Sequence, residues 1–126
     1  MSDWILLVED HIPNQRMITR RLERRGYAVR CASTGEEAIE LAQSDRPALV
    51  LMDLGLPGID GYESMRRIRQ GEKTMGIPVL ALTAHDTSDT RLRVMEAGFV
   101  GFQSKPIDFE RLITLITPFV DAAERP

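Results

Sequence analysis

The sequence predicts a doubly wound α/β fold, in which helices cover both faces of one parallel sheet. Five short apolar runs recur along the 126 residues, and segments with helical periodicity separate them. The runs at 4–8, 48–52 and 77–83 are almost continuously apolar, which is typical of strands that are buried on both faces. Because crossovers between parallel strands are right-handed, this alternation leads to a sheet between two helical layers.

The first two predicted helices carry signals at their ends. Pro13 suits the first turn of a helix, and Gly26 ends the segment that follows it. Thr34 and Glu37 stand three residues apart, which is a capping-box pattern at the start of the next helix. The sequence therefore predicts helices directly after the first and second apolar runs.

The later helices have similar signals. Ser88 is expected to cap the fourth helix and Gly98 to end it. Asp108 opens the last helix, and Pro118 predicts a kink or an early stop because it lacks a backbone donor. In chain order, the expected strands are 4–8, 27–32, 48–52, 77–83 and 100–104, and the expected helices are 14–26, 34–43, 62–71, 88–98 and 108–116.

The amino-acid composition favours a globular domain and argues against a nucleic-acid-binding or membrane-spanning protein. A hydrophobic fraction of 43% and a charged fraction of 28% are ordinary for one globular domain, which we expect to span 1–126. The net charge of −3 argues against direct nucleic-acid binding, and no apolar run approaches the ~20 residues of a membrane span. The single cysteine, Cys31, fits a reducing cytoplasm.

Five polar residues stand where predicted strands end. Glu9 and Asp10 follow the first run, Asp53 and Thr83 end the third and fourth, and Lys105 follows the fifth. In such sheets ligands bind at this edge, where the three carboxylates need a hard cation such as Mg²⁺. The lysine can pair with an anion, and the hydroxyl can donate to a phosphoryl oxygen. The set predicts phosphoryl transfer, with Asp53 as the nucleophile.

The chain resembles the receiver domain of two-component response regulators over essentially its whole length. The matching motifs are VED (8–10), LMDLGLPGIDG (51–61), LTA (82–84) and KP (105–106). The resemblance implies a flavodoxin-like five-stranded sheet in the order 2-1-3-4-5. It also implies a stand-alone, chemotaxis-type single-domain receiver.

Residue by residue, the resemblance implies a phosphoacceptor and a metal site. Asp53 is similar to the phosphoacceptor, and Mg²⁺ (or Mn²⁺) is expected on Glu9, Asp10, Asp53 and the backbone carbonyl of Gly55. The family often carries a larger side chain at the position of Gly55. Gly55 and His85 are therefore interpreted as modulators of water access to the acyl phosphate.

The same resemblance implies the parts of a switch. Thr83 and Ala84 are expected to contact the phosphoryl group together with Lys105. Phe102 resembles the aromatic switch residue, although an aromatic on a last strand is often simply part of the core. The bond before Pro106 is expected to be cis and to help place the lysine.

The implied function is a regulator rather than an enzyme. A histidine kinase or a histidine phosphotransfer protein would supply the phosphoryl group, and a downstream protein would read the fourth helix, the fifth strand and the fifth helix. The segment RMITRRLERR (16–25) places several arginines along one helical face. That face is either simply solvated or a docking surface for an acidic patch on the phosphoryl donor.

Two alternatives belong to other classes. A flavodoxin-like cofactor binder would need a phosphate-binding loop after the first strand, but residues 9–14 place two carboxylates there. A degenerate receiver that binds partners without phosphorylation is disfavoured, because all five polar positions are present.

Overall fold

A computed structural model describes residues 3–121 of the chain. Its strands are β1 (Trp4–Val8), β2 (Ala28–Ala32), β3 (Leu49–Asp53), β4 (Val79–Thr83) and β5 (Gly101–Ser104). Its helices are α1 (Ile12–Arg24), α2 (Gly35–Ser44), α3 (Gly61–Gln70), α4 (Ser88–Ala97) and α5 (Phe109–Ile116). Strand and helix therefore alternate five times, as the sequence predicts.

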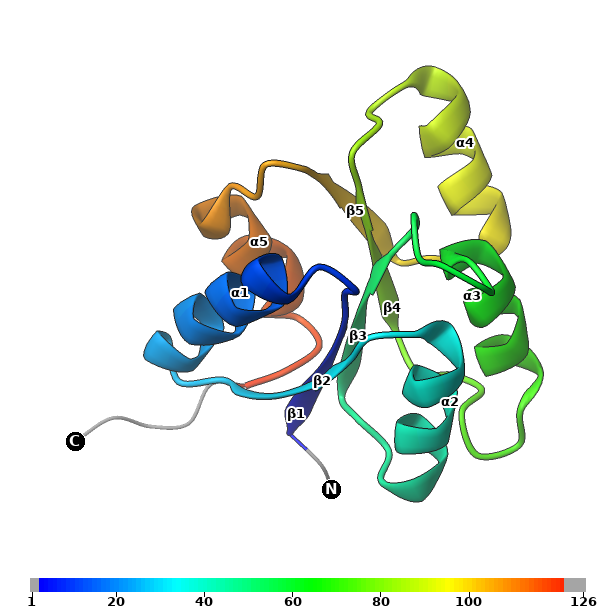
Figure 1. Ribbon diagram of the computed structural model, residues 1–126, viewed down its shortest axis with the longest axis horizontal. Helices are drawn as coiled ribbons and strands as arrows, with labels where there is room; N and C mark the ends of the chain where they lie inside the picture. Colours follow the sequence, from blue (N-terminus) through cyan, green and yellow to red (C-terminus); the bar gives the residue numbers. More distant parts are fainter. Residues whose placement is uncertain (1–2, 122–126) are drawn as a thin grey trace.

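The five strands form one parallel sheet in the order β2-β1-β3-β4-β5, which confirms the predicted order. Helices α1 and α5 cover one face of the sheet, and α2, α3 and α4 cover the other (Figure 1). Every residue of β1, β3 and β4 is buried, as expected for strands covered on both faces. Strand order reverses between β1 and β3, so the ligand edge lies at their carboxyl ends.

Alternate residues of the central strands supply two separate cores. Leu6 and Met52 pack against α2, α3 and α4, while Leu7 and Leu51 pack against α1 and α5. All four side chains are completely buried. Burial of each such side chain contributes roughly 1.5–3 kcal/mol. The strand ends are therefore fixed to a rigid framework, and the loops that follow them are held in place.

Most of the predicted helix signals are found in the structure. Pro13 lies in the first turn of α1. The Thr34 hydroxyl accepts from the backbone N–H of Glu37 at 3.1 Å, and the Glu37 carboxylate accepts from the N–H of Ser33 at 3.0 Å. Helix α5 ends at Ile116, before Pro118, so the early stop is confirmed.

The predicted cap of α4 is wrong by one residue. Thr87 is the N-cap, because its hydroxyl accepts from the N–H of Thr90 at 3.1 Å, and Ser88 is the first helical residue. Within residues 3–121, no helix is both long and apolar enough to cross a membrane.

Candidate functional site

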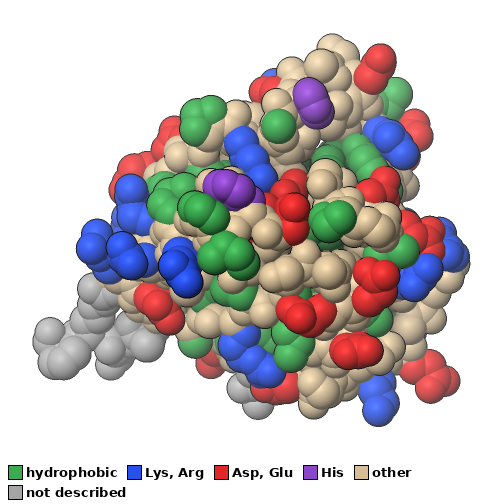
Figure 2. Space-filling view, in the orientation of Figure 1, with side chains coloured by type: hydrophobic (Ala, Val, Ile, Leu, Met, Phe, Trp, Pro, Cys, Tyr) green, Lys and Arg blue, Asp and Glu red, His purple; other side chains and the backbone are tan. Residues whose placement is uncertain are grey.

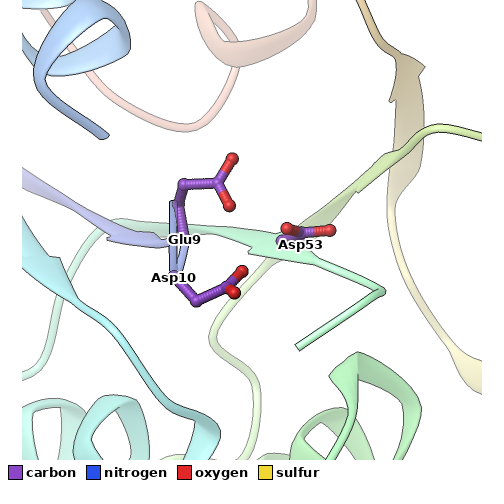
Figure 3. Close-up of side chains that lie close together, drawn as sticks. All are labelled: Glu9, Asp10 and Asp53. Atoms are coloured by element: carbon purple, nitrogen blue, oxygen red, sulfur yellow. The ribbon is translucent and has the colours of Figure 1, made fainter. Parts of the chain in front are cut away.

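Three carboxylates from two neighbouring strands meet at the carboxyl edge of the sheet. Glu9 and Asp10 lie directly after β1, and Asp53 is the last residue of β3. Figure 3 shows the three side chains gathered on one side of these strand ends. One carboxylate oxygen from each lies within 4.8 Å of the other two, which is close enough for a shared cation. The convergence that the sequence predicts is therefore present.

Lys105 joins two of these carboxylates from the opposite end of the chain. Its Nζ lies 2.9 Å from Glu9 Oε1 and 3.1 Å from Asp53 Oδ2. The lysine side chain is 21% exposed, whereas that of Glu9 is 1% exposed. A lysine directly after β5 can reach both acids because β5 and β1 end at the same edge. This contact neutralises one of the two buried charges.

Burial and neighbouring charges shift the pKa of both Glu9 and Lys105. Burial and the neighbouring Asp53 raise the pKa of Glu9 above its ordinary value, although Lys105 acts in the opposite direction. For Lys105, burial alone lowers the pKa, but the hydrogen bonds and charges of Glu9 and Asp53 together raise it above the ordinary value. The site thus holds more negative charge than its lysine neutralises.

Local hydrogen bonds fix the other groups. Asp53 Oδ1 accepts from the backbone N–H of Gly55 at 3.0 Å, which leaves the carboxylate at the rim rather than in the core. The Thr83 hydroxyl donates to the carbonyl of His85 at 3.2 Å and accepts from its N–H at 3.0 Å. For Thr83 to donate to any other acceptor, it must first release His85.

A pocket of about 310 Å³ opens beside Asp53. The predicted residues Gly55, Thr83, Ala84 and His85 all line it. Phe102 is half-buried on β5 and packs at the margin of the core under α4, beside the guanidinium of Arg91 at 5.3 Å. The Lys105–Pro106 bond is cis, as expected.

The sequence alone did not single out several residues that shape this site. Asn14 Nδ2 donates to Glu9 Oε1 at 3.4 Å, and Asp60, Tyr62 and Arg93 line the pocket beside Asp53. Asp60 could have been found, since it stands directly before a helical pattern and caps α3 through the N–H of Glu63. Asn14 reaches Glu9 from the first turn of α1, whereas Tyr62 and Arg93 come together through packing between α3 and α4, which has no signal in the sequence.

Gly61 permits the close packing of α3 beneath the loop after β3. A Cβ at this position would lie 2.7 Å from the carbonyl oxygen of Asp53 and 2.8 Å from Leu54 Cα. Both atoms belong to the backbone and cannot move aside cheaply. The glycine of the motif therefore brings α3 directly under the phosphoacceptor candidate.

Comparison with known proteins identifies the family. The family model for the response regulator receiver domain matches residues 5–117. The chain belongs to this family. The family is the phosphorylation-dependent signalling switch of two-component systems, so the chain has a regulatory role.

Individual relatives agree with this assignment. The polar-differentiation response regulator DivK of Brucella ovis is 32% identical over 98% of this chain and 100% of its own length. The transcriptional regulatory protein HprR of Escherichia coli is 35% identical over 89% of this chain, which spans only 49% of HprR. The chain likewise spans 24% of the response regulator PleD of Caulobacter vibrioides.

Solved structures show the same fold. The receiver domain of the sensor histidine kinase PA1611 of Pseudomonas aeruginosa superposes with a TM-score of 0.85 at 34% identity. The match covers 94% of this chain and 98% of that domain. That structure has a magnesium ion coordinated in its active-site cleft.

Proposed function

We propose that Asp53 accepts a phosphoryl group from a phosphohistidine of a histidine kinase or a phosphotransfer protein, and that residues 1–126 act as one receiver domain. The single observation that carries the proposal is the meeting of Glu9, Asp10 and Asp53 with Lys105 at one sheet edge. In the step, an Asp53 oxygen forms a bond to phosphorus as the phosphorus–nitrogen bond breaks. The electron pair of that bond stays with the imidazole.

The donor set of this edge fits Mg²⁺ (or Mn²⁺). Glu9, Asp10 and Asp53 supply carboxylate oxygens, and the exposed Gly55 can add its backbone carbonyl. Burial and the neighbouring Asp53 raise the pKa of Glu9, and a divalent cation would relieve the repulsion between these carboxylates. When bound, such an ion neutralises charge on the carboxylates and on phosphoryl oxygens. The magnesium ion of the PA1611 receiver supports this assignment.

The residues around Asp53 supply the switch. A phosphoryl group on Asp53 attracts Lys105 and gives the Thr83 hydroxyl a better acceptor than the His85 carbonyl. The exposed residue Ala84 lines the same pocket. Movement of Thr83 frees space for Phe102 on the adjacent strand. The result is a shift between two states of the β4–α4–β5 region.

Two surfaces suit the two kinds of partner. Exposed arginines of α1 line a groove of about 410 Å³ with Met17, and Figure 2 shows Lys and Arg side chains gathered over this helix. An acidic patch on the phosphoryl donor would complement them. Leu92, Met95 and Val100 are exposed on α4 and just before β5, which supports a downstream protein that reads the α4–β5–α5 face.

We further propose a regulator that assists only its own phosphorylation and dephosphorylation and acts in the cytoplasm. The site is a set of groups around one acceptor carboxylate, and the single cysteine suits a reducing compartment. Family membership also favours this function over a flavodoxin-like cofactor binder, and the complete set of five residues disfavours a degenerate receiver.

The direct test is incubation with acetyl phosphate, followed by intact mass measurement. With Mg²⁺ the protein should gain the mass of one phosphoryl group, and chelation of divalent ions should prevent the gain because the carboxylates then repel the anionic donor. A protein that gains no mass at any Mg²⁺ concentration would contradict the proposed function.

Gly55 and His85 are expected to set the lifetime of the acyl phosphate. A Cβ at Gly55 would lie 3.8 Å from Asp53 Oδ1, so a side chain fits beside the carboxylate and shields it from water. Gly55→Asn should lengthen the half-life and His85→Ala should shorten it, each by about threefold, which needs only ~0.7 kcal/mol in the barrier. The half-life is measured by loss of the phosphorylated mass after donor removal. Unchanged half-lives in both variants would exclude the role.

A further inference from the structure

The pocket beside Asp53 has a second basic wall that the proposed function does not use. Arg93 of α4 and Tyr62 of α3 line this pocket. The two helices are neighbours on one face of the sheet (Figure 1). Lys105, by contrast, is not among the lining residues and bonds Asp53 through Oδ2. The other carboxylate oxygen, Asp53 Oδ1, accepts a hydrogen bond from the backbone N–H of Gly55, and Gly55 lines the pocket. An anion that approaches Asp53 through this pocket therefore passes Arg93, in addition to the Lys105 that already contacts Asp53.

Aromatic contacts hold Arg93 at this position. Its guanidinium carbon lies 3.9 Å from the centroid of the Tyr62 ring. The Tyr62 ring in turn meets buried Phe99 edge-to-face, with centroids 6.1 Å apart and an interplanar angle of 87°. The arginine is thus placed by a stack that is anchored in the core, and its planar face needs no carboxylate to fix it.

The hydrogen-bond donors of Arg93 remain available. In the part of the chain that the structure describes, Arg93 makes no hydrogen bond or ion pair, whereas Arg66 and Arg67 of α3 bond to Glu63. Arg91, on the same helix as Arg93, bonds to Asp86. A guanidinium that lines a pocket and has five free donors is suited to a phosphate oxygen pair.

A larger groove leads to the same pair of residues. Tyr62 and Arg93 also line a groove of about 560 Å³ between α3 and α4, together with Arg66 and Arg69. Because Arg66 is paired with Glu63, the positive charge that this groove offers to an anion comes from Arg69 and Arg93, and Glu96 opposes it. Asp60 also lines the pocket and opposes them, but its Oδ1 is occupied by the backbone N–H of Glu63.

We propose that Arg93 is an anion-binding residue of the Asp53 pocket, which holds the phosphoryl group of small acyl-phosphate donors. The inference rests on the proposed function and adds one residue, Arg93, to the groups that bind the phosphoryl donor. An Asp53 oxygen forms the bond to phosphorus, and the bond from phosphorus to the acyl oxygen breaks. The electron pair leaves with the carboxylate, and no proton needs to move.

The test compares phosphorylation by acetyl phosphate in Mg²⁺ between wild type and Arg93→Gln. The second-order rate constant should fall about fivefold, the value expected for loss of one hydrated charge contact near 4 Å. The rate of the wild type should also fall with added salt more steeply than that of the variant. Arg93→Lys, which keeps the charge and loses the stacked plane, should recover part of the rate.

Arg66→Gln is the matched control. Arg66 lines the larger groove between α3 and α4 but not the pocket beside Asp53, and it is paired with Glu63. It should keep the rate and the salt dependence close to those of wild type. Equal rates for Arg93→Gln and wild type, an equal loss in Arg66→Gln, or no recovery in Arg93→Lys would each overturn the inference alone. A wild type that gains no phosphoryl group would instead overturn the proposed function, and this inference with it.

Discussion

Replacement of Asp53 with asparagine is expected to abolish the gain of a phosphoryl group from acetyl phosphate and Mg²⁺. The amide is nearly isosteric, and its oxygen can still accept from the N–H of Gly55, which now bonds Asp53 Oδ1 at 3.0 Å. The amide cannot replace the carboxylate as the nucleophile, because its oxygen carries no full negative charge. Intact mass and the circular dichroism spectrum report the loss of reaction and the retention of the fold.

The chain offers a matched control in the same pocket. Asp60 also lines the pocket, and its Oδ1 caps α3 by accepting from the N–H of Glu63 at 2.9 Å. Asn is as good an N-cap as Asp, so Asp60→Asn should preserve both the helix and the reaction. If Asp53→Asn were still phosphorylated, or if Asp60→Asn lost the reaction to the same extent, Asp53 would not be the acceptor.

The fold could be predicted from the sequence because each strand and helix has local signals, such as apolar runs and residues that begin or end helices. The continuously apolar runs of β1, β3 and β4 are buried on both faces, and the Thr34 capping box and the Pro118 stop lie where expected. The error at Ser88 has a physical cause. Thr87 and Ser88 are both good caps, and only the backbone decides which hydroxyl reaches the third N–H of the helix.

The site could be predicted only in part. Glu9, Asp53 and Lys105 converge because each stands at a strand end, and strand ends can be located from the apolar pattern. The two hydrogen bonds of Thr83 with His85, and the stacking of Arg93 on Tyr62, depend on loop geometry and on helix-to-helix packing. Neither leaves a periodic trace in the sequence, so neither was expected.

Replacement of Lys105 with alanine is expected to destabilise the metal-free protein by about 2–3 kcal/mol, since it leaves buried carboxylates without their cation. Lys105 contacts Glu9, which is 1% exposed, and Asp53, whose side chain is 10% exposed. Urea unfolding in the presence of a chelator measures the loss. Added Mg²⁺ should raise the stability of the variant more than that of wild type, because the ion then has no competing ammonium.

Arg25→Ala is the matched control for this prediction. The nitrogen–oxygen distance in the Arg25–Glu110 pair is 2.9 Å, the same as in the Lys105–Glu9 pair. The side chains of Arg25 and Glu110, however, are 45% and 82% exposed. Exposed pairs contribute no more than about 1 kcal/mol, so the control should lose much less stability than Lys105→Ala. Equal losses in the two variants would show that burial of the carboxylates does not govern the effect.

The pH dependence of the Lys105→Ala effect follows from the pKa shifts. The folded protein raises the pKa of Lys105, so the stabilisation by the ammonium is complete below the unfolded value of about 10.4 and is lost as pH rises through the folded value. On the acid side, the raised pKa of Glu9 means that this carboxylate loses its charge earlier than an ordinary glutamate as pH falls. The stability difference between wild type and Lys105→Ala should therefore be largest near neutral pH and decrease toward both extremes. A difference that did not change with pH would indicate lost packing of the lysine stem rather than lost charge.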